Sequence, residues 1–259
     1  MEITMKKLIL SALTLALAIL VSQDSLAGIP APLEDWCVSQ MSAWAPPGKS
    51  MYADAKETVD EGTLRYRQIA KDAISVAYDP AEAPLFPGPY GRAKTLATML
   101  GIADSESGFR KDVDFGKGAY AKGDSGKSWC LMQVRLGTAV NGKTPNRVAL
   151  KGGVYEFVYD GVSGFGGEDL VKDRKACFRV ALHIMRDSFN QCSDLPVDER
   201  LSIYTSGSHD NGRAASKIRV GKAIKWLAAV APPMEDTSVL SQLSGGVSAI
   251  SSTSFALNP

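Results

Sequence analysis

The sequence has almost no imbalance between acidic and basic residues, and it contains no internal repeat. Its 259 residues include 29 Lys and Arg against 28 Asp and Glu, which leaves a formal net charge of +1. A nucleic-acid-binding domain usually carries a basic excess on one face, so this balance gives no electrostatic indication of nucleic acid as a partner. It does not exclude a polymer that is recognised mainly through hydrogen bonds and stacking.

Residues suited to metal binding and to nucleophilic catalysis are also scarce. Only two histidines are present: His183 lies within a predicted helix, and His209 lies in a polar loop. With the cysteines expected to be oxidised, two isolated histidines do not make a zinc site. No Gly-x-Ser-x-Gly segment and no Cys–His pairing stands out. We therefore expect neither a metal nor any other cofactor.

One segment resembles a nucleotide-binding motif but lacks its setting. Residues 121–128, Ala-Lys-Gly-Asp-Ser-Gly-Lys-Ser, match a permissive phosphate-loop pattern with alanine in place of the first glycine. A true phosphate loop follows a buried strand and precedes a helix. Here residues 115–118, Phe-Gly-Lys-Gly, do not form such a strand. We therefore expect no nucleotide ligand.

Long apolar runs are absent except near the amino terminus. A basic pair at residues 6–7 precedes the apolar run from Leu8 to Val21, and Ser25-Leu26-Ala27 follows with small residues at its first and third positions. A membrane span needs roughly 20 apolar residues, and this run is shorter. The pattern is typical of a secretory signal peptide over residues 1–27. We therefore expect an exported protein, either periplasmic or associated with the cell wall.

Four cysteines remain after the predicted cleavage: Cys37, Cys130, Cys177 and Cys192. Export makes disulfides the default, and an even number fits two bridges. Cys177 and Cys192 flank a predicted helix that would hold them roughly 22 Å apart, whereas a bridge needs Cα atoms within about 7 Å. Each is therefore expected to pair with Cys37 or Cys130. The alternative is that some of them are free buried thiols.

The spacing of apolar residues predicts a mainly α (α+β) fold. A lead-in segment at 28–59 precedes one mostly helical domain at 60–232, and a Ser-rich tail without periodicity occupies 233–259. Residues 111–128, rich in Gly, Lys and Asp, are predicted to form an exposed loop. Helices are expected over residues 34–44, 63–78, 93–105, 169–189 and 216–230, with a short element starting at 201 and a β-prone run at 154–159.

Glu106 is the strongest candidate for a catalytic side chain. It stands at the end of a predicted helix whose inner face is apolar, so its carboxyl group is expected to be partly desolvated. Desolvation raises the pKa of a carboxyl group. A raised pKa keeps the proton in place at neutral pH, as a general acid requires. The alternative is a solvated glutamate at a fraying helix end.

The surroundings of Glu106 resemble a known family. Residues 103–109, Ala-Asp-Ser-Glu-Ser-Gly-Phe, are similar to the Glu-Ser-x-Phe signature of lytic transglycosylases in the lysozyme-like superfamily. Residues 130–134, Cys-Leu-Met-Gln-Val, resemble that family's Gly-Leu-Met-Gln-Ile segment, and residues 203–207, Ile-Tyr-Thr-Ser-Gly, resemble its Ala-Tyr-Asn-Ala-Gly segment. The three motifs follow the family's order. Cys130 replaces the glycine and Thr205 replaces the asparagine.

The resemblance implies a lysozyme-like domain that cuts peptidoglycan glycan strands between N-acetylmuramic acid and N-acetylglucosamine. Glu106 would donate a proton to the glycosidic oxygen. It would then accept one from the C6 hydroxyl of the muramic acid, which closes to a 1,6-anhydro product without consuming water.

The same resemblance implies roles for the neighbouring residues. Tyr204 would hydrogen-bond near Glu106 or the substrate, and Ser107 would help to hold the acid. Met132 and Gln133 would line the cleft. Among the tryptophans, Trp129 is the best placed to stack on a sugar because it lies beside this motif, whereas Trp226 is predicted to be core.

Two alternatives remain open from the sequence. A hydrolytic lysozyme needs a second carboxyl group about 5–9 Å from the first, and Asp112, Asp114 and Asp124 are candidates, although loop aspartates beside lysines are usually solvated. Alternatively, the chain is a non-catalytic wall-binding or scaffolding protein. Such a protein would contact a cell-envelope secretion apparatus through its tail.

Overall fold

A computed structural model describes residues 31–136, 158–159, 162–163 and 166–233. Within these ranges the chain is mainly helical, as the sequence predicts, and it has two short antiparallel strand pairs. The predicted signal peptide, all but the first residue of the predicted tail, and residues 154–157 of the β-prone run lie outside the described residues. No helix in the described ranges is long and apolar enough to span a membrane.

Helix α2 (Ala31–Trp44) forms within the predicted lead-in segment and packs against α3. Its Met41 side chain is fully buried, and Trp36 stacks on Trp226 of the last helix with ring centroids 3.7 Å apart. Burial of these large rings removes much apolar surface from water, which is the main source of folding free energy. The lead-in segment therefore shares one core with the rest of the chain.

Helix α3 (Val59–Ala77) begins four residues earlier than the apolar periodicity predicts. Thr58 and Glu61 form a capping box: the Thr58 hydroxyl accepts from the Glu61 N–H at 3.2 Å, and the Glu61 carboxylate accepts from the Thr58 N–H at 2.8 Å. This reciprocal pair satisfies two backbone donors that the first helical turn leaves without intrahelical partners. The polar first turn carries no apolar stripe, which is why periodicity alone missed it.

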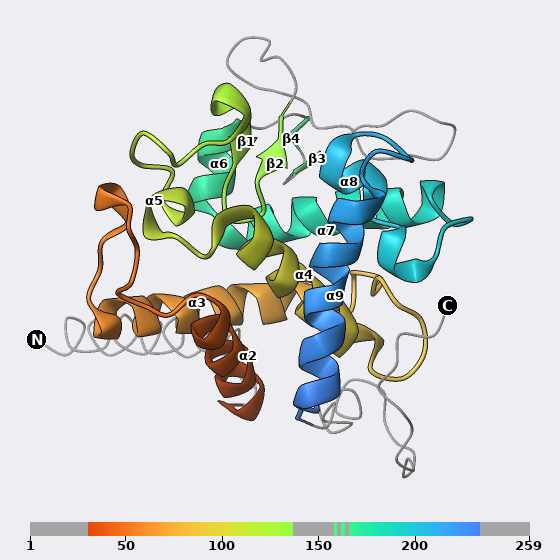
Figure 1. Ribbon diagram of the computed structural model, residues 1–259, viewed down its shortest axis with the longest axis horizontal. Helices are drawn as coiled ribbons and strands as arrows, with labels where there is room; N and C mark the ends of the chain where they lie inside the picture. Colours follow the sequence, from red (N-terminus) through yellow and green to blue (C-terminus); the bar gives the residue numbers. More distant parts are fainter. Residues whose placement is uncertain (1–30, 137–157, 160–161, 164–165, 234–259) are drawn as a thin grey trace, which may run out of the picture.

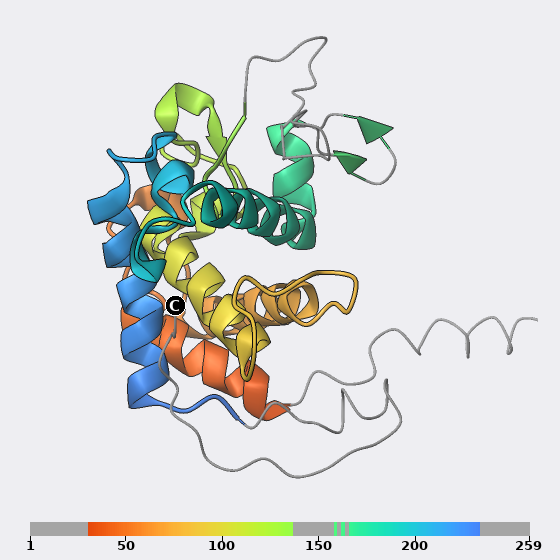
Figure 2. The same cartoon turned by 90° about the vertical axis from the view of Figure 1, so that its right-hand side faces the viewer.

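Helix α4 (Gly91–Ser107) is the central helix of the molecule and is buried along most of its length. It packs against α2 and α3, and along α9 (Arg213–Ala229), which runs beside it (Figures 1 and 2). The hydroxyls of its buried Thr95 and Thr98 bond back to carbonyls one turn earlier, at 2.7 and 2.8 Å. These bonds satisfy polar groups that would be costly to bury alone.

The segment predicted as an exposed loop at 111–128 is partly helical and partly buried, so that prediction is wrong for its first residues. Residues Lys111–Asp114 form α5, and both Asp112 and Asp114 are buried. Arg110 pairs with Asp112 at 2.6 Å. Asp114 accepts from Arg65 of α3 at 3.4 Å and from Arg174 at 2.8 Å. Arg65 and Arg174 come from distant parts of the sequence, so local composition could not reveal their pairing with Asp114.

The helix predicted over 169–189 is two helices, α6 (Gly167–Lys172) and α7 (Arg174–Gln191). Asp173 separates them in an extended conformation, and its carboxylate accepts from the Ala176 N–H at 3.1 Å. Aspartate is a favoured N-cap because its side chain satisfies a free backbone donor. The break turns α6 away from α7, which contacts α3 across the core (Figure 1).

Two short strand pairs and helix α8 complete the described fold. Strand β1 (Ser128–Trp129) pairs with β2 (Val134–Arg135), and β3 (Val158–Tyr159) pairs with β4 (Val162–Ser163), both antiparallel. The second pair lies at the opposite end of the molecule from α2 (Figure 2) and agrees with the predicted hairpin where it is described. Helix α8 (Ser202–Ser206) and short 3₁₀ turns at Ala53–Ala55, Asp124–Gly126 and Val197–Glu199 connect the larger helices.

One disulfide joins Cys130 to Cys177, which bears out the exclusion of a Cys177–Cys192 bridge. It ties the β1–β2 turn to α7. The expected second bridge is absent from the described residues, because Cys37 and Cys192 are buried free thiols. That outcome agrees with the alternative that some of the cysteines are buried thiols.

The Asp114 ion-pair network makes a testable contribution to stability. Asp114→Asn should lower the free energy of unfolding by about 2 kcal/mol. It removes the charge that Arg65 and Arg174 share, although Arg65 keeps Glu57 and Arg174 keeps Asp72 as a partner. Urea unfolding followed by circular dichroism measures the change. Asp60→Asn, on an exposed position of α3, is the matched control and should change little. Equal stability of the two variants would contradict the role assigned to the network.

The cysteine pairing is testable by alkylation and peptide mapping. We expect a linked Cys130–Cys177 peptide, and alkylation of Cys37 and Cys192 only after unfolding. Both free thiols are buried, and burial raises the pKa of the Cys37 thiol, so little reactive thiolate is present there. A peptide linking Cys37 to any other cysteine would show that the pairing is different.

Candidate functional site

Glu106 lies in the last turn of α4, where the helix ends at a left-handed residue. Gly108 has φ +56°, and its N–H donates to the Asp104 carbonyl at 2.8 Å. Glycine adopts this conformation without the steric cost that other residues incur. The chain then turns sharply through Phe109, which is fully buried and packs edge-on against Tyr66. Glu106 is thereby held at the boundary between the core and the surface.

The Glu106 carboxyl is half-buried and forms an ion pair across the α4–α9 contact. Its Oε1 accepts from Arg219 Nε at 2.8 Å, and the two side chains are only 19% and 18% exposed. Burial raises the pKa of Glu106 above its ordinary value, and the Arg219 guanidinium partly offsets that rise. The predicted desolvation is therefore present, together with a counter-charge that the sequence did not indicate.

Asp124 is a second carboxylate close enough to influence Glu106. Its negative charge also raises the pKa of Glu106, although less than burial does. Its Oδ2 accepts from the Ser128 hydroxyl at 2.7 Å, which fixes the carboxylate across a tight turn. Three aspartates were considered as a second catalytic group. Asp112 and Asp114 are buried in ion pairs, whereas Asp124 is exposed and its charge acts on Glu106.

Residues 130–133 form the tip of the β1–β2 hairpin, so the Leu-Met-Gln motif is a tight turn. Gln133 N–H donates to the Cys130 carbonyl at 3.0 Å, and the Gln133 side-chain amide bonds the same carbonyl at 3.1 Å. The Gln133 Oε1 accepts from the Gly123 N–H at 3.0 Å. Gln133 therefore holds the turn that carries Asp124, while the disulfide at Cys130 anchors the hairpin to α7.

Tyr204 of α8 bonds this hairpin and lies near enough to Glu106 for the charge of that carboxyl to act on it. Its hydroxyl donates to the Met132 carbonyl at 2.8 Å, and its N–H donates to the Ser188 hydroxyl of α7 at 3.2 Å. Burial, together with the nearby Glu106 charge, raises the pKa of Tyr204 well above its ordinary value. The phenol therefore stays protonated and remains a donor. Glu106, Met132 and Tyr204 are thus brought together from three distant segments.

Met132 and Ser107, which were also predicted for the site, make structural contacts. The Met132 side chain is fully buried, so it packs in the core, and the residue meets Tyr204 through its carbonyl. The Ser107 hydroxyl bonds the Ala103 carbonyl at 2.7 Å and accepts from the Phe109 N–H at 3.3 Å. Ser107 therefore fixes the end of α4, where Glu106 lies.

The ring of Trp129, the candidate for sugar stacking, is packed by other residues. Lys122 Nζ lies 3.9 Å from the centre of the ring. Gly167 packs so closely on the ring that an added Cβ would come within 1.9 Å of it. Only glycine fits against the ring at this position. These contacts fix Trp129 against α6 and restrict the ring surface left for a ligand.

The backbone around Glu106 is unusually strained. Positive φ angles outside glycine cost energy and persist only where the surrounding structure enforces them. In the described ranges six such residues occur, and all but Tyr90 lie between 109 and 133: Phe109, Asp124, Ser125, Cys130 and Gln133. Such strain clusters at functional sites more often than elsewhere. The turns at 124–125 and 130–133 are therefore held in a defined shape.

Arg219 is the site residue that sequence reasoning missed. It stands in a helix with several other basic residues, so residue type alone does not distinguish it. One signal was present: α4 carries Asp104 beside Glu106, and α9 carries Arg219 and Lys222 one turn apart. In the structure Lys222 pairs with Asp104, and Arg219 pairs with Glu106. Two complementary pairs along neighbouring helices fix how these helices align.

Both histidines are engaged in carboxylate contacts. His183 contacts Glu82 at 3.0 Å, and His209 contacts Asp194 and Asp210 at 3.0 and 2.9 Å. Within the described ranges no group of three His, Cys, Asp or Glu side chains is arranged to hold a metal ion.

The environment of Glu106 predicts its titration. A carbon-13 NMR titration should place the pKa of Glu106 above the usual value of about 4.3, since burial outweighs the guanidinium. Arg219→Gln should move that pKa higher still, because the charge that favours the ionised form is removed. Lys225→Gln, the same charge change on an exposed position of α9, is the control. A fall in the pKa on loss of Arg219 would contradict this electrostatic description.

Comparisons with known proteins add no family to this description. Searches against protein-family models, curated proteins and solved structures each found no match. The likeness to lytic transglycosylases therefore rests on three short sequence motifs, and membership of that family stays a prediction.

Proposed function

We propose that the chain is a peptidoglycan lytic transglycosylase that cleaves the β-1,4 bond between N-acetylmuramic acid and N-acetylglucosamine. The observation that carries this proposal is the half-buried Glu106 carboxyl, whose pKa is raised by burial and which lies close to Tyr204. A raised pKa increases the protonated fraction that a general acid needs. The ordered motifs at 103–109, 130–134 and 203–207 add support from the sequence.

In the proposed reaction, Glu106 first donates its proton to the glycosidic oxygen as the bond from that oxygen to C1 of the muramic acid breaks. The resulting carboxylate then takes the proton of the C6 hydroxyl, whose oxygen bonds to C1 and closes the 1,6-anhydro ring. One proton leaves the carboxyl and one returns, so no water and no second acid are consumed. Arg219 stabilises the carboxylate between the two steps through the 2.8 Å contact.

Two features hold the β1–β2 hairpin in place, while Arg219 holds the acid itself. Tyr204 fixes the β1–β2 hairpin through the Met132 carbonyl, and the Cys130–Cys177 disulfide anchors the same hairpin to α7. Pre-positioned groups lose little entropy on reaching the transition state, which contributes much of the rate in such reactions. The helical fold with its small β hairpins fits the proposed lysozyme-like class. The disulfide fits a chain that matures in an oxidising compartment.

A lysozyme-type hydrolase is the second candidate, and Asp124 is the observation that favours it. Its charge acts on Glu106, and its carboxylate is exposed next to the hairpin. In a hydrolase a second carboxylate activates water or forms a covalent intermediate. The products separate the two mechanisms, because hydrolysis leaves reducing ends and transglycosylation leaves anhydro ends. A scaffolding protein without activity is the third reading, and it would yield neither product.

Glu106→Gln tests the proposed acid. It keeps the size of the side chain but removes the titrating proton, so clearing of purified sacculi should fall about a hundredfold or more. Binding to sacculi in a pelleting assay should be retained. The variant should still unfold in one cooperative thermal transition, at a somewhat lower midpoint because the ion pair with Arg219 is lost. Mass spectrometry of the wild-type digest should show 1,6-anhydro ends.

Glu168→Gln serves as the control, since Glu168 is an exposed glutamate of α6, and its activity should equal that of the wild type. If the Glu106 variant cleared sacculi at the wild-type rate, the assigned acid would be wrong. Reducing ends in the wild-type digest, together with loss of activity in Asp124→Asn, would favour the hydrolase.

A further inference from the structure

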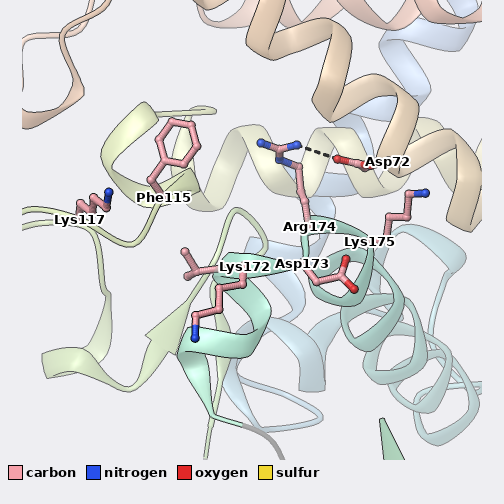
Figure 3. A pocket seen from close by; sticks show the side chains of 8 residues that line it. Asp72, Phe115, Lys117, Lys172, Asp173, Arg174 and Lys175 are labelled. Carbon is pink, nitrogen blue, oxygen red and sulfur yellow. Dashed lines mark hydrogen bonds and ion pairs between the residues drawn. The ribbon is translucent and has the colours of Figure 1, made fainter. Parts of the chain in front are cut away.

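A cavity lies on the described structure among residues that do not belong to the Glu106 site. It has a volume of about 470 Å³ and is bordered by α3, the turn after α5 and the α6–α7 junction (Figure 3). Phe115 and Val171 supply its apolar surface, and Phe115 is 44% exposed. None of the residues assigned to the candidate site lines it. The remaining lining residues are charged: Asp72, Lys117, Lys172, Asp173, Arg174 and Lys175.

The acidic groups of this cavity are already engaged by the protein. Asp72 accepts from Arg174 at 2.7 Å, as the dashed line in Figure 3 marks, and Asp173 accepts from the Ala176 N–H at 3.1 Å to cap α7. Arg174 itself is shared between Asp72 and Asp114. These charges offset one another inside the wall of the cavity and leave little for a ligand.

The three lysines of the cavity, unlike its acidic residues, have charges that no described residue pairs. Lys117, Lys172 and Lys175 are exposed, and no carboxylate lies within ion-pair distance of any of them among the residues that the structure describes. Their side chains extend from three sides of the cavity in Figure 3. Lysine ammonium groups are strongly hydrated point charges that attract anions from any direction. The mouth of the cavity is therefore cationic, although the chain as a whole carries a net charge of only +1.

We propose that this cavity binds a carboxylate-bearing peptide, with the acid groups at the three lysines and an apolar part against Phe115 and Val171. Spaced cations around an apolar surface suit a short peptide with more than one carboxylate better than a single compact anion. In the wall polymer, such peptides are carried on the muramic acid. The choice of this peptide rests on the proposed function, whereas the preference for carboxylates rests on the charges alone.

The position of the cavity supports contact with both parts of such a polymer. Arg174 lies three residues before Cys177, whose disulfide reaches the hairpin at Cys130. Helix α6, which supplies Lys172 to the cavity, also packs against Trp129 of the same hairpin. The cavity and the hairpin that Tyr204 contacts therefore adjoin the same two helices, α6 and α7. In the proposal, a glycan strand bound at Glu106 presents its peptide toward the lysines.

The test uses free stem peptide released from sacculi by an amidase, with binding measured by calorimetry on the full exported chain. Lys117→Gln, Lys172→Gln and Lys175→Gln in one variant should weaken binding about tenfold, since each exposed ion pair contributes a factor of a few. Amidation of the peptide carboxylates should weaken binding to the wild type similarly. Raising the salt concentration should also weaken it, because ions screen exposed charges.

A triple variant of Lys49, Lys56 and Lys225 to Gln is the matched control, because these lysines are exposed elsewhere and carry the same total charge. It should bind as the wild type does. Equal binding by the two triple variants would overturn the proposal, and so would inorganic phosphate that competes as strongly as the peptide. Cleavage of peptide-free glycan by the cavity variant should equal that of the wild type, because none of the three lysines belongs to the Glu106 site. This measurement separates the question from the proposed function.

Discussion

The candidate site depends on the close packing of α4 against α9. At Gly101 the two helices approach so nearly that an added Cβ would meet the Arg219 carbonyl at 3.3 Å. This approach brings the Arg219 guanidinium to the Glu106 carboxyl at the end of α4. Without α9, the acid would face water at a helix end, and its pKa would lose both the effect of burial and the opposing effect of the arginine. One interhelical contact therefore sets the protonation of the proposed acid.

Buried charge also positions the other half of the site. Asp114 joins Arg65 of α3 to Arg174 of α7, and it lies at the end of the short helix that follows Glu106. The chain continues from there to the turn at Asp124. A buried ionic network is a weak source of net stability but a strong constraint on geometry, since partial rearrangement leaves charges unpaired. Its effect here is to fix the path of the loop that borders the acid.

Much of this arrangement could be predicted from the sequence, and the remainder could not for physical reasons. Apolar periodicity located α3, α4 and α9, and the apolar helix before Glu106 indicated a desolvated carboxyl. Periodicity does not report pairing between charged residues far apart in the chain, so Arg219 and the buried Asp114 were missed. The break at Asp173 depends on a capping bond of a single side chain, which leaves the apolar stripe on both sides intact.

The resemblance to lytic transglycosylase motifs indicated which segments of the chain meet, but not the direction of each side chain. It predicted Tyr204 near the acid and Met132 in the cleft, and the structure places the Tyr204 hydroxyl on the Met132 carbonyl. It also treated Met132 as a cleft-lining side chain, whereas that side chain is fully buried. A short motif identifies which segments meet, but the direction of each side chain depends on the backbone, and here Cys130 and Gln133 adopt left-handed conformations that tilt the turn.

The bond between Cys130 and Cys177 has a consequence for when the site takes shape. The two sulfurs are 47 residues apart in sequence, and the tip of the hairpin reaches its anchor on α7 through them. In a reducing compartment that link is broken, and the turn carrying Gln133 relies on hydrogen bonds alone. The covalent constraint is therefore present only where thiols are oxidised, and there it narrows the range of conformations open to the unfolded chain by closing a long loop.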